Sequence, residues 1–380
     1  MDSKQVVILG GGMAGAATAY FLTQMGVRDI LLLEREKDPG IHSTGRNAAI
    51  LRSAIATPAL HALAQESLPF FRNPPPGFSQ TPLLDPVGLI LAAPQGQEAS
   101  LDWLQQEPQA FACRPLILDQ VYDRIPFLAK HLGLAFEVPD EGVLDVHALL
   151  LAFLHGARQN GAEIRFGTTA QRLRIQRDRV VAVETSTGSF PTEAFVDAGG
   201  GWAGQLAASA GYPLAITPKR RHLLVTNPLP EVNPRWPVVW LQGDDFYFRP
   251  ESGGLLLSAC DVTEVRPEEG EFAQTEVMET IAEKCSRWLP DLGDAQAAHF
   301  WAGMRTFADD ESFILGPDPR LQGLYWLAGL GGHGITCGPA AGQRLAAELA
   351  GQGNLDAVAL ALRPDRLLSV PTGLPTAGDK

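Results

Sequence analysis

Cysteine is scarce in this chain, and none of it is arranged as a metal or disulfide motif. The 380 residues include 4 cysteines, Cys113, Cys260, Cys285 and Cys337, with no CxxC pair among them. Scattered cysteines of this kind indicate neither a zinc site nor a disulfide framework, and they favour reduced thiols in a cytoplasmic protein. We therefore predict no metal site.

Long apolar runs and a secretory signal are also missing. No stretch approaches the roughly 20 apolar residues that a membrane-spanning helix needs. The N-terminal sequence MDSKQVVILGGG has neither a basic n-region nor a cleavage site, so its apolar run is predicted to be a strand. We expect a cytoplasmic protein without a transmembrane segment, and peripheral contact with the inner membrane stays open.

Basic residues are in the minority. Lys and Arg number 30 against 43 Asp and Glu, which gives a formal net charge of -13. An acidic body repels phosphates, so no nucleic-acid partner is expected, and an anionic substrate needs a local basic pocket. With 45% hydrophobic and 19% charged residues, the chain is predicted to be globular and is long enough for two domains.

A glycine-rich turn follows the first predicted strand, residues 6–9. Gly10, Gly12 and Gly15 stand in G-x-G-x-x-G order and are followed by a small-residue helix. In this motif the glycines permit a tight turn, a close approach of pyrophosphate and close packing of helix on strand. Glu34 follows Gly15 at the end of the second strand, where a carboxylate meets ribose hydroxyls. The pattern predicts an NAD or FAD site and disfavours NADP.

The loop after this carboxylate favours a flavin over NAD. Residues 35–54, REKDPGIHSTGRNAAILRSA, are rich in small and hydroxyl residues where an NAD dehydrogenase ordinarily continues its strand and helix alternation. A second glycine turn, GGHGI, stands at 331–335 before an alanine-rich helical stretch. A helix start and backbone donors at such a turn stabilise the negative charge of a reduced flavin.

The motifs resemble those of the D-amino acid oxidase (DAO) superfamily of FAD-dependent oxidoreductases. The likeness rests on GGGMAGAATAYFL, Glu34 and HSTGRNAA, and within the superfamily it is greatest to bacterial D-arginine dehydrogenase-like and glycine oxidase-like proteins, through NPPPGF, PKRR, FYFRP, WAGMRTF and GGHGI. The resemblance implies FAD as the cofactor. The sarcosine oxidase branch attaches flavin to a cysteine after the stretch resembling GMRTF, but Thr306, Phe307 and Ala308 stand there, so noncovalent FAD is expected.

The expected fold is α/β with two domains, a Rossmann-type (glutathione reductase-like) FAD domain and a mostly antiparallel β-sheet substrate domain. The FAD domain is predicted to be discontinuous, from 1–79, 146–211 and 303–365. Residues 80–145 and 212–302 are predicted to form the substrate domain, and 366–380 a tail. The predicted cofactor-binding residues are Gly10, Gly12, Met13, Ala14, Gly15, Glu34, Arg35, Ser43, Thr44, Gly45, Arg46, Asn47, Ala48, Ala170, Ala198, Gly199, Gly200, Trp202, Gly303, Arg305, Gly331, Gly332, His333, Gly334, Ile335 and Thr336.

Arginine and tyrosine residues are the candidates for holding a substrate carboxylate. Arg305 stands in an apolar stretch, and the resemblance implies that it and Tyr247 bind the carboxylate, as a planar guanidinium and an oriented hydroxyl can. Arg220 and Arg221 enter a strand, where alternation sends them to opposite faces. We predict a role for Arg220 and a structural or solvated role for Arg221. His333 has either a catalytic role beside the flavin or a purely structural one.

The sequence also departs from the family pattern. Relatives of the D-arginine dehydrogenase type carry a glutamate for the cationic side chain near the position of Leu89, so a basic substrate is not expected. The pocket is predicted to be more apolar, unless Arg52 faces inward and selects an acidic side chain.

The predicted reaction is oxidative deamination of an amino acid, a D-amino acid or a glycine-like amine. Hydride transfer to flavin N5 gives an imine, which hydrolyses to a keto acid. Two alternatives remain: oxidation of a 2-hydroxy acid or secondary amine, and a noncatalytic FAD-binding subunit. The sequence does not specify whether oxygen, a quinone or a carrier accepts the electrons.

Overall fold

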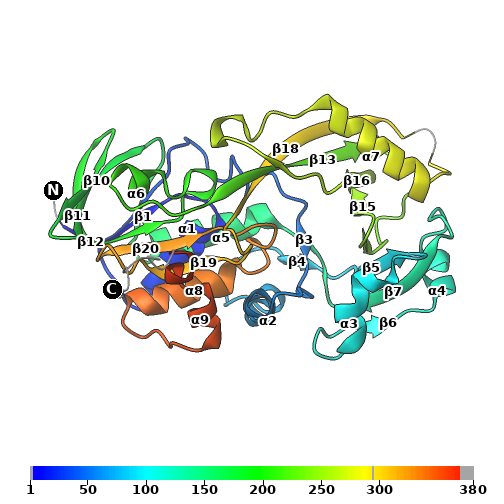
Figure 1. Cartoon of the computed structure of the whole chain (residues 1–380), viewed down its shortest axis with the longest axis horizontal. Coiled ribbons are helices and arrows are strands. Elements are labelled where there is room, and N and C mark those ends of the chain that lie inside the picture. The colour runs from blue at the N-terminus through cyan, green and yellow to red at the C-terminus, as the bar shows by residue number, and fades with distance from the viewer. Residues whose placement is uncertain (1–2, 293–294, 369–380) are drawn as a thin grey trace, which may run out of the picture.

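The computed structural model describes residues 3–292 and 295–368. Two large sheets dominate it, and the two long strands β13 and β18 extend between the two halves of the molecule (Figure 1). The first sheet consists of β1 (Lys4–Leu9), β2 (Ile30–Leu33), β9 (Glu163–Arg165), β10 (Ala170–Gln176), β11 (Arg179–Thr185), β12 (Gly188–Asp197), β19 (Ile314–Pro317) and β20 (Leu324–Ala328).

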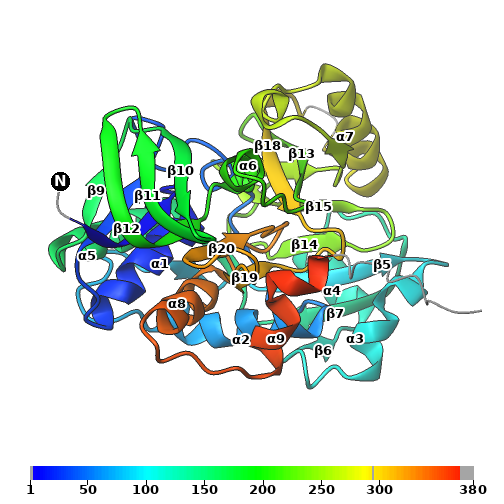
Figure 2. The ribbon, with the colours of Figure 1, turned by 60° about the vertical axis from the view of Figure 1, so that its left-hand side comes forward.

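The centre of the first sheet is parallel. β1 pairs in parallel with β2 and β12, and β12 pairs in parallel with β20. β10 and β11 add an antiparallel extension to the first half of β12, beside the helical layer (Figure 2). The residues of β2, ILLL, are all buried, which explains their unbroken apolar sequence.

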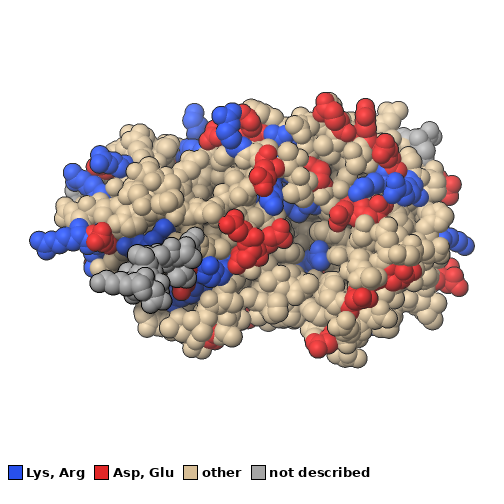
Figure 3. All heavy atoms as spheres, in the orientation of Figure 1, with Lys and Arg blue, Asp and Glu red and all other residues tan. Residues whose placement is uncertain are grey.

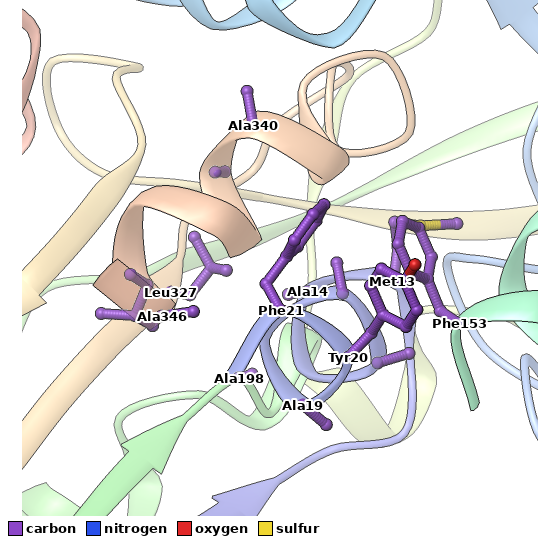
Figure 4. Packing of buried hydrophobic residues seen from close by; sticks show 14 of the residues in the cluster. Met13, Ala14, Ala19, Tyr20, Phe21, Phe153, Ala198, Leu327, Ala340 and Ala346 are labelled. Carbon is purple, nitrogen blue, oxygen red and sulfur yellow. The ribbon is translucent and has the colours of Figure 1, made fainter. Parts of the chain in front are cut away.

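Helices cover the first sheet and are packed closely through small residues. They are α1 (Met13–Gln24), α2 (Pro58–Arg72), α5 (Val146–Gln159), α8 (Gly338–Leu349) and α9 (Ala357–Leu362). A Cβ on Gly342 would lie 2.6 Å from that of Ala17, so a glycine is required where α8 meets α1. The rings of Tyr20 and Phe21 on α1 lie near Phe153 of α5, with centroids 5.4 and 6.0 Å from it, and Figure 4 shows Tyr20 beside Phe153. This packing fixes α1 and therefore the glycine turn before it.

The second sheet is mostly antiparallel, and the pairing of β14 with β5 is parallel. Its strands are β5 (Leu89–Pro94), β6 (Arg114–Pro115), β7 (Leu132–Val138), β13 (Thr217–Thr226), β14 (Val238–Leu241), β15 (Phe246–Glu251), β16 (Gly254–Ser258), β17 (Thr263–Glu264) and β18 (Ala297–Phe307). A small third sheet orders β3 (Ile50–Leu51), β8 (Gly142–Leu144) and β4 (Leu84–Asp85). Shorter helices are α3 (Asp102–Gln106), α4 (Leu118–Arg124) and α6 (Gln205–Ser209), and α7 (Thr275–Trp288) packs its buried Ile281, Cys285 and Trp288 into the core of this half.

The architecture confirms the predicted combination of a Rossmann-type sheet with a mostly antiparallel sheet. The boundary predicted between residues 302 and 303 falls inside β18, which pairs with β13 on both sides of it. Arg366, at the start of the predicted tail, forms an ion pair of 2.7 Å with Asp310, and residues 369–380 lie outside the described part of the chain.

One face of the molecule shows how its surface charges are distributed. On the face drawn in Figure 3, acidic and basic side chains are interspersed on a largely uncharged surface. In the part of the chain that the structure describes, no helix has the length and apolar character required to cross a bilayer.

Candidate active site

Two adjoining cavities lie where β1, β12 and β20 end. Both are lined by Gly12, Ser43, Thr44, Ala198 and Gly200, so they share a wall. We name the part that contains Glu34 and Trp202 the first cavity, and the part that contains Arg305 and His333 the second cavity. Carboxyl ends of parallel strands are the usual position of ligands in such sheets.

The first glycine turn has the geometry that a dinucleotide requires. Gly10 has φ +102°, and a side chain there would collide with the carbonyl of Ala198. Gly12 is the N-cap of α1 and has no side chain to cap the first turn of the helix. The N–H of Met13 donates to the Thr44 hydroxyl, and Gly12 leaves the following N–H groups of the turn uncapped for a phosphate. Gly15 lies outside the cavity lining, because its Cα packs against the carbonyl of Gly10.

The carboxylate of Glu34 is fixed at the end of β2. It accepts hydrogen bonds from the backbone N–H of Gly11, at 2.7 Å, and of Glu36, at 2.8 Å. The first cavity also contains Ala170 and Trp202, and the guanidinium of Arg35 lies 3.8 Å from the centre of the Trp202 ring. This cavity therefore offers a fixed carboxylate for ribose and flat surfaces for an adenine.

The loop between the cavities is held by its own polar side chains. The hydroxyl of Thr44 accepts from Met13 N at 3.1 Å, and Asn47 bonds both Thr44 O and Ala49 N. Arg46 forms an ion pair of 3.1 Å with Glu271. Gly45, like Gly15, serves packing, since it lies against Gly40 and is not part of the lining.

The second glycine turn, Gly331 to Thr336, lies in the second cavity just before α8 begins at Gly338. Gly332 faces Arg305 closely, since a Cβ there would lie 3.1 Å from a guanidinium nitrogen. His333 is open to the cavity but otherwise deep in the protein. Burial, together with the positive charges of Arg52 and Arg305, lowers the pKa of His333 to about 3. His333 is therefore neutral at physiological pH.

Arg305 and Tyr247, the two candidates for holding a substrate carboxylate, both line the second cavity. Arg305 forms no hydrogen bond or ion pair with any other described residue, and burial followed by the charge of Arg221 lowers its pKa. The Tyr247 hydroxyl is buried and has no hydrogen-bond partner among the described residues. The neighbouring Ser258 hydroxyl donates its proton to the carbonyl of His222 instead. An unpaired guanidinium and an unpaired hydroxyl in one cavity are available to an anion.

Arg220 was predicted to act in the site and Arg221 to be structural or solvated, but the structure places Arg221 in the cavity and Arg220 outside it. Arg221 lines the second cavity, whereas Arg220 points to the other face of β13 and donates to Glu269 O at 2.6 Å. In the register of β13 with β18, Arg221 lies opposite Gly303, so it shares a face with Arg305 two residues further on. Arg221 therefore replaces Arg220 as a candidate site residue.

Arg52 faces the second cavity and does not point to solvent. Its guanidinium carbon lies 4.5 Å from the centre of the Trp240 ring, and that ring contacts Tyr247 with centroids 4.5 Å apart. Burial lowers the pKa of Arg52 to about 10, and the nearby Glu141 opposes part of this shift. Leu89 is fully buried in the second sheet and is not part of the lining.

Glu141 is an important residue that the sequence did not reveal. It is fully buried, one carboxylate oxygen accepts from Ser53 N at 2.5 Å, and the other has no partner among the described residues. Burial raises its pKa from 4.5 to about 7, although hydrogen bonds from Ser53 and the charge of Arg52 oppose the rise. No sequence pattern marks this glutamate, because its burial depends on the pairing of β8 with β3 and β4.

A glutamine at position 141 is expected to stabilise the protein at alkaline pH. The pKa of Glu141 is higher in the folded protein than in the unfolded chain, so the neutral carboxyl favours the folded state. This contribution to the free energy of unfolding is fully present below about pH 4.5 and is lost as the pH rises through about 7. Glu141→Gln keeps the acceptor for Ser53 without the charge, so we expect Tm to rise by on the order of 3 °C at pH 8. Thermal unfolding of both proteins should show equal Tm values at pH 4, and an equal Tm at pH 8 would contradict the prediction.

Other residues of the site also escaped the sequence. Trp240 and Leu223 line the second cavity, and His42 lines the first. Burial disfavours the charged form of His42, but hydrogen bonds to Glu271 and Glu36 outweigh it and raise the pKa. Alternation along β13 places Leu223 on the same face as Arg221, and this pattern in the sequence links the two residues.

Comparison with known proteins agrees with this geometry. The family model described as "FAD dependent oxidoreductase" (DAO) matches residues 5–348. A glycine oxidase of Pseudomonas aeruginosa is 28% identical over 374 residues, with 92% of this chain and 96% of the relative covered. The mitochondrial pyruvate dehydrogenase phosphatase regulatory subunit of Mus musculus is 29% identical over 373 residues; the match covers 90% of this chain but only 41% of that protein.

Solved structures show the same fold. The L-proline dehydrogenase of P. horikoshii superimposes with a TM-score of 0.85 at 19% identity, covering 96% of this chain and 98% of that one. The glycine oxidase of Bacillus cereus superimposes with a TM-score of 0.81 at 24% identity, and the match covers 98% of this chain and 100% of that one. The family match extends over most of the chain, and its range includes all the residues that line both cavities. The chain therefore belongs to the DAO family of FAD-dependent oxidoreductases.

Proposed function

We propose that this protein oxidises an amino acid or a related amine, with FAD held noncovalently across the two cavities. The observation that carries the proposal is the pair Arg305 and Tyr247, whose donors are unpaired among the described residues and face the second cavity beside the glycine turn. A substrate carboxylate satisfies both at once. The relatives described as glycine oxidase and dimethylglycine dehydrogenase act on substrates of this class, which supports the assignment.

The residues of the chain have distinct tasks in this reaction. The turn Gly10 to Ala14 and the carboxylate of Glu34 would hold the pyrophosphate and ribose of FAD, and the turn Gly331 to Thr336 would contact its ring. Arg305 and Tyr247 bind the substrate carboxylate and orient the carbon that bears the amine, while burial excludes water. Bound FAD supplies the hydride acceptor, and the resulting imine hydrolyses to a keto acid and ammonia.

Two features of the second cavity restrict the substrate. Its lining contains no Asp or Glu among the described residues, so a strongly basic side chain finds no counter-charge. Oxidation of a 2-hydroxy acid needs a base for the hydroxyl proton, and the one histidine of this lining, with a pKa of about 3, is a weak base. An amine supplies its own lone pair, so the neutral His333 favours an amine substrate.

A panel of candidate substrates tests the proposal. The purified protein is kept without oxygen while D- and L-amino acids, glycine, sarcosine and 2-hydroxy acids are added singly, and the visible flavin absorbance is followed. We expect amino acids or amines to bleach the flavin and hydroxy acids to leave it oxidised. A yellow protein that nothing bleaches would overturn the proposal and favour a noncatalytic role, consistent with the similarity to a regulatory subunit.

A further inference from the structure

Four arginines line the second cavity, and no described acidic residue is part of its lining. Arg46 is paired with Glu271, whereas the other three form no ion pair with any described residue. Arg221 comes from β13, Arg305 from β18 and Arg52 from the segment after β3. Arg305 lies within electrostatic range of both others, since the charge of Arg221 acts on it and it acts on Arg52. Buried cations without partners are costly, so a cluster of three indicates an anionic ligand.

Each of the three guanidinium groups has donors to spare. The Nε of Arg52 donates to the carbonyl of Ala54, at 3.2 Å, and its guanidinium lies over the Trp240 ring. Arg221 uses its Nε on the carbonyl of Asp261, at 2.7 Å, and its Nη1 is buried with no partner among the described residues. Arg305 uses none of its donors on another described residue. The fork of a guanidinium is suited to two parallel bonds to one carboxylate.

The nearby carboxylates compensate this charge only partly. Both oxygens of Asp261 are engaged by His222, at 2.9 Å from its backbone N and 2.7 Å from its Nδ1. Glu141 is held by Ser53 N and lies outside the lining of the cavity. One substrate carboxylate would occupy the donors of Arg305 and Tyr247. The terminal nitrogens of Arg52, whose guanidinium lies over the Trp240 ring, would still have no hydrogen-bond partner among the described residues.

We propose that the substrate carries a second carboxylate and that Arg52 binds it. Arg305 and Tyr247, with Arg221 beside them, hold the carboxylate next to the reacting carbon, and Arg52 on the face of Trp240 holds the one at the far end. The substrate class is therefore an acidic amino acid or a dicarboxylic amine. This inference rests on the proposed function and narrows it.

Inert dicarboxylates test the pocket independently of catalysis. Succinate and glutarate are titrated into the FAD-loaded protein by calorimetry, with propionate and butyrate as monocarboxylate controls. We expect the dicarboxylates to bind about 10- to 100-fold more tightly, as a desolvated ion pair allows. Arg52→Gln should remove this preference, whereas the matched control Arg220→Gln, on the opposite face of β13, should retain it. If Arg52→Gln does not fold, Arg52→Lys, which keeps the charge but loses the planar fork, should show a weakened preference.

The outcomes separate this inference from the proposed function. Equal binding of both ligand classes, no binding of either, or a preference that survives the change at Arg52 would overturn the inference. With substrates, kcat/KM for aspartate and glutamate should exceed that for asparagine and glutamine in wild type, and the difference should vanish in Arg52→Gln. If amides and acids are oxidised equally well, the second carboxylate is refuted and the amine oxidation stands. If nothing is oxidised but dicarboxylates still bind through Arg52, the proposed function fails and the anion pocket stands.

Discussion

Replacing Arg305 with glutamine is expected to reduce kcat/KM for amino acid oxidation by roughly 10²- to 10³-fold while FAD remains bound. In the proposed function, the guanidinium is the charged partner of the substrate carboxylate, and loss of one member of a buried ion pair costs about 2–5 kcal/mol. Glutamine keeps a donor and much of the volume, so the cavity does not collapse. Rates of anaerobic flavin bleaching against substrate concentration provide kcat/KM.

Stability measurements distinguish this effect from misfolding. Burial and Arg221 both lower the pKa of Arg305, which means that its charge is unfavourable in the ligand-free protein. Arg305→Gln should therefore leave the Tm of the FAD-free protein unchanged or raise it. Arg220→Gln is the control, because Arg220 lies outside the cavity lining. This variant should oxidise substrate as the wild-type protein does. A normal kcat/KM in Arg305→Gln would show that the substrate carboxylate binds elsewhere.

The cofactor half of the site was predictable from the sequence because it depends on local backbone geometry. Gly10, Gly12 and Glu34 occupy fixed steps of one strand, turn, helix and strand, and the structure places all three in the first cavity. The turn 331–336 was predicted for the same reason, and it lies in the second cavity. Such motifs need only short-range spacing to be recognised.

The substrate half depends on contacts between distant segments, and there the sequence was less informative. Alternation along β13 showed that Arg220 and Arg221 face opposite ways, but which of them meets the cavity is decided by the register with β18, about 80 residues away along the chain. Arg52 faces inward because β3 is held by β8. The burial of Glu141 likewise arises from strand pairing that no local pattern reveals.

Placing a valine at Gly12 is expected to weaken FAD binding by roughly 100-fold without unfolding the protein. Gly12 has φ −76° and ψ −172°, an extended conformation that valine adopts readily, so the backbone is not strained. A Cβ there would lie 3.1 Å from the Thr44 hydroxyl and extend into the space where the two cavities join. Forcing a side chain into a tightly packed place costs about 1–3 kcal/mol, and here that cost is borne by the bound cofactor.

Gly10 provides the contrast that makes this prediction specific. Its φ of +102° is unfavourable for any other residue, and a side chain would collide with the Ala198 carbonyl, so Gly10→Val should lower the Tm of the FAD-free protein itself. Gly12→Val should lower that Tm much less, because its backbone is not strained and the Thr44 hydroxyl is the one described atom that the added Cβ approaches. FAD titration followed by fluorescence, with thermal unfolding of both variants, separates the two effects. If Gly12→Val binds FAD as tightly as wild type, the pyrophosphate does not lie against this turn.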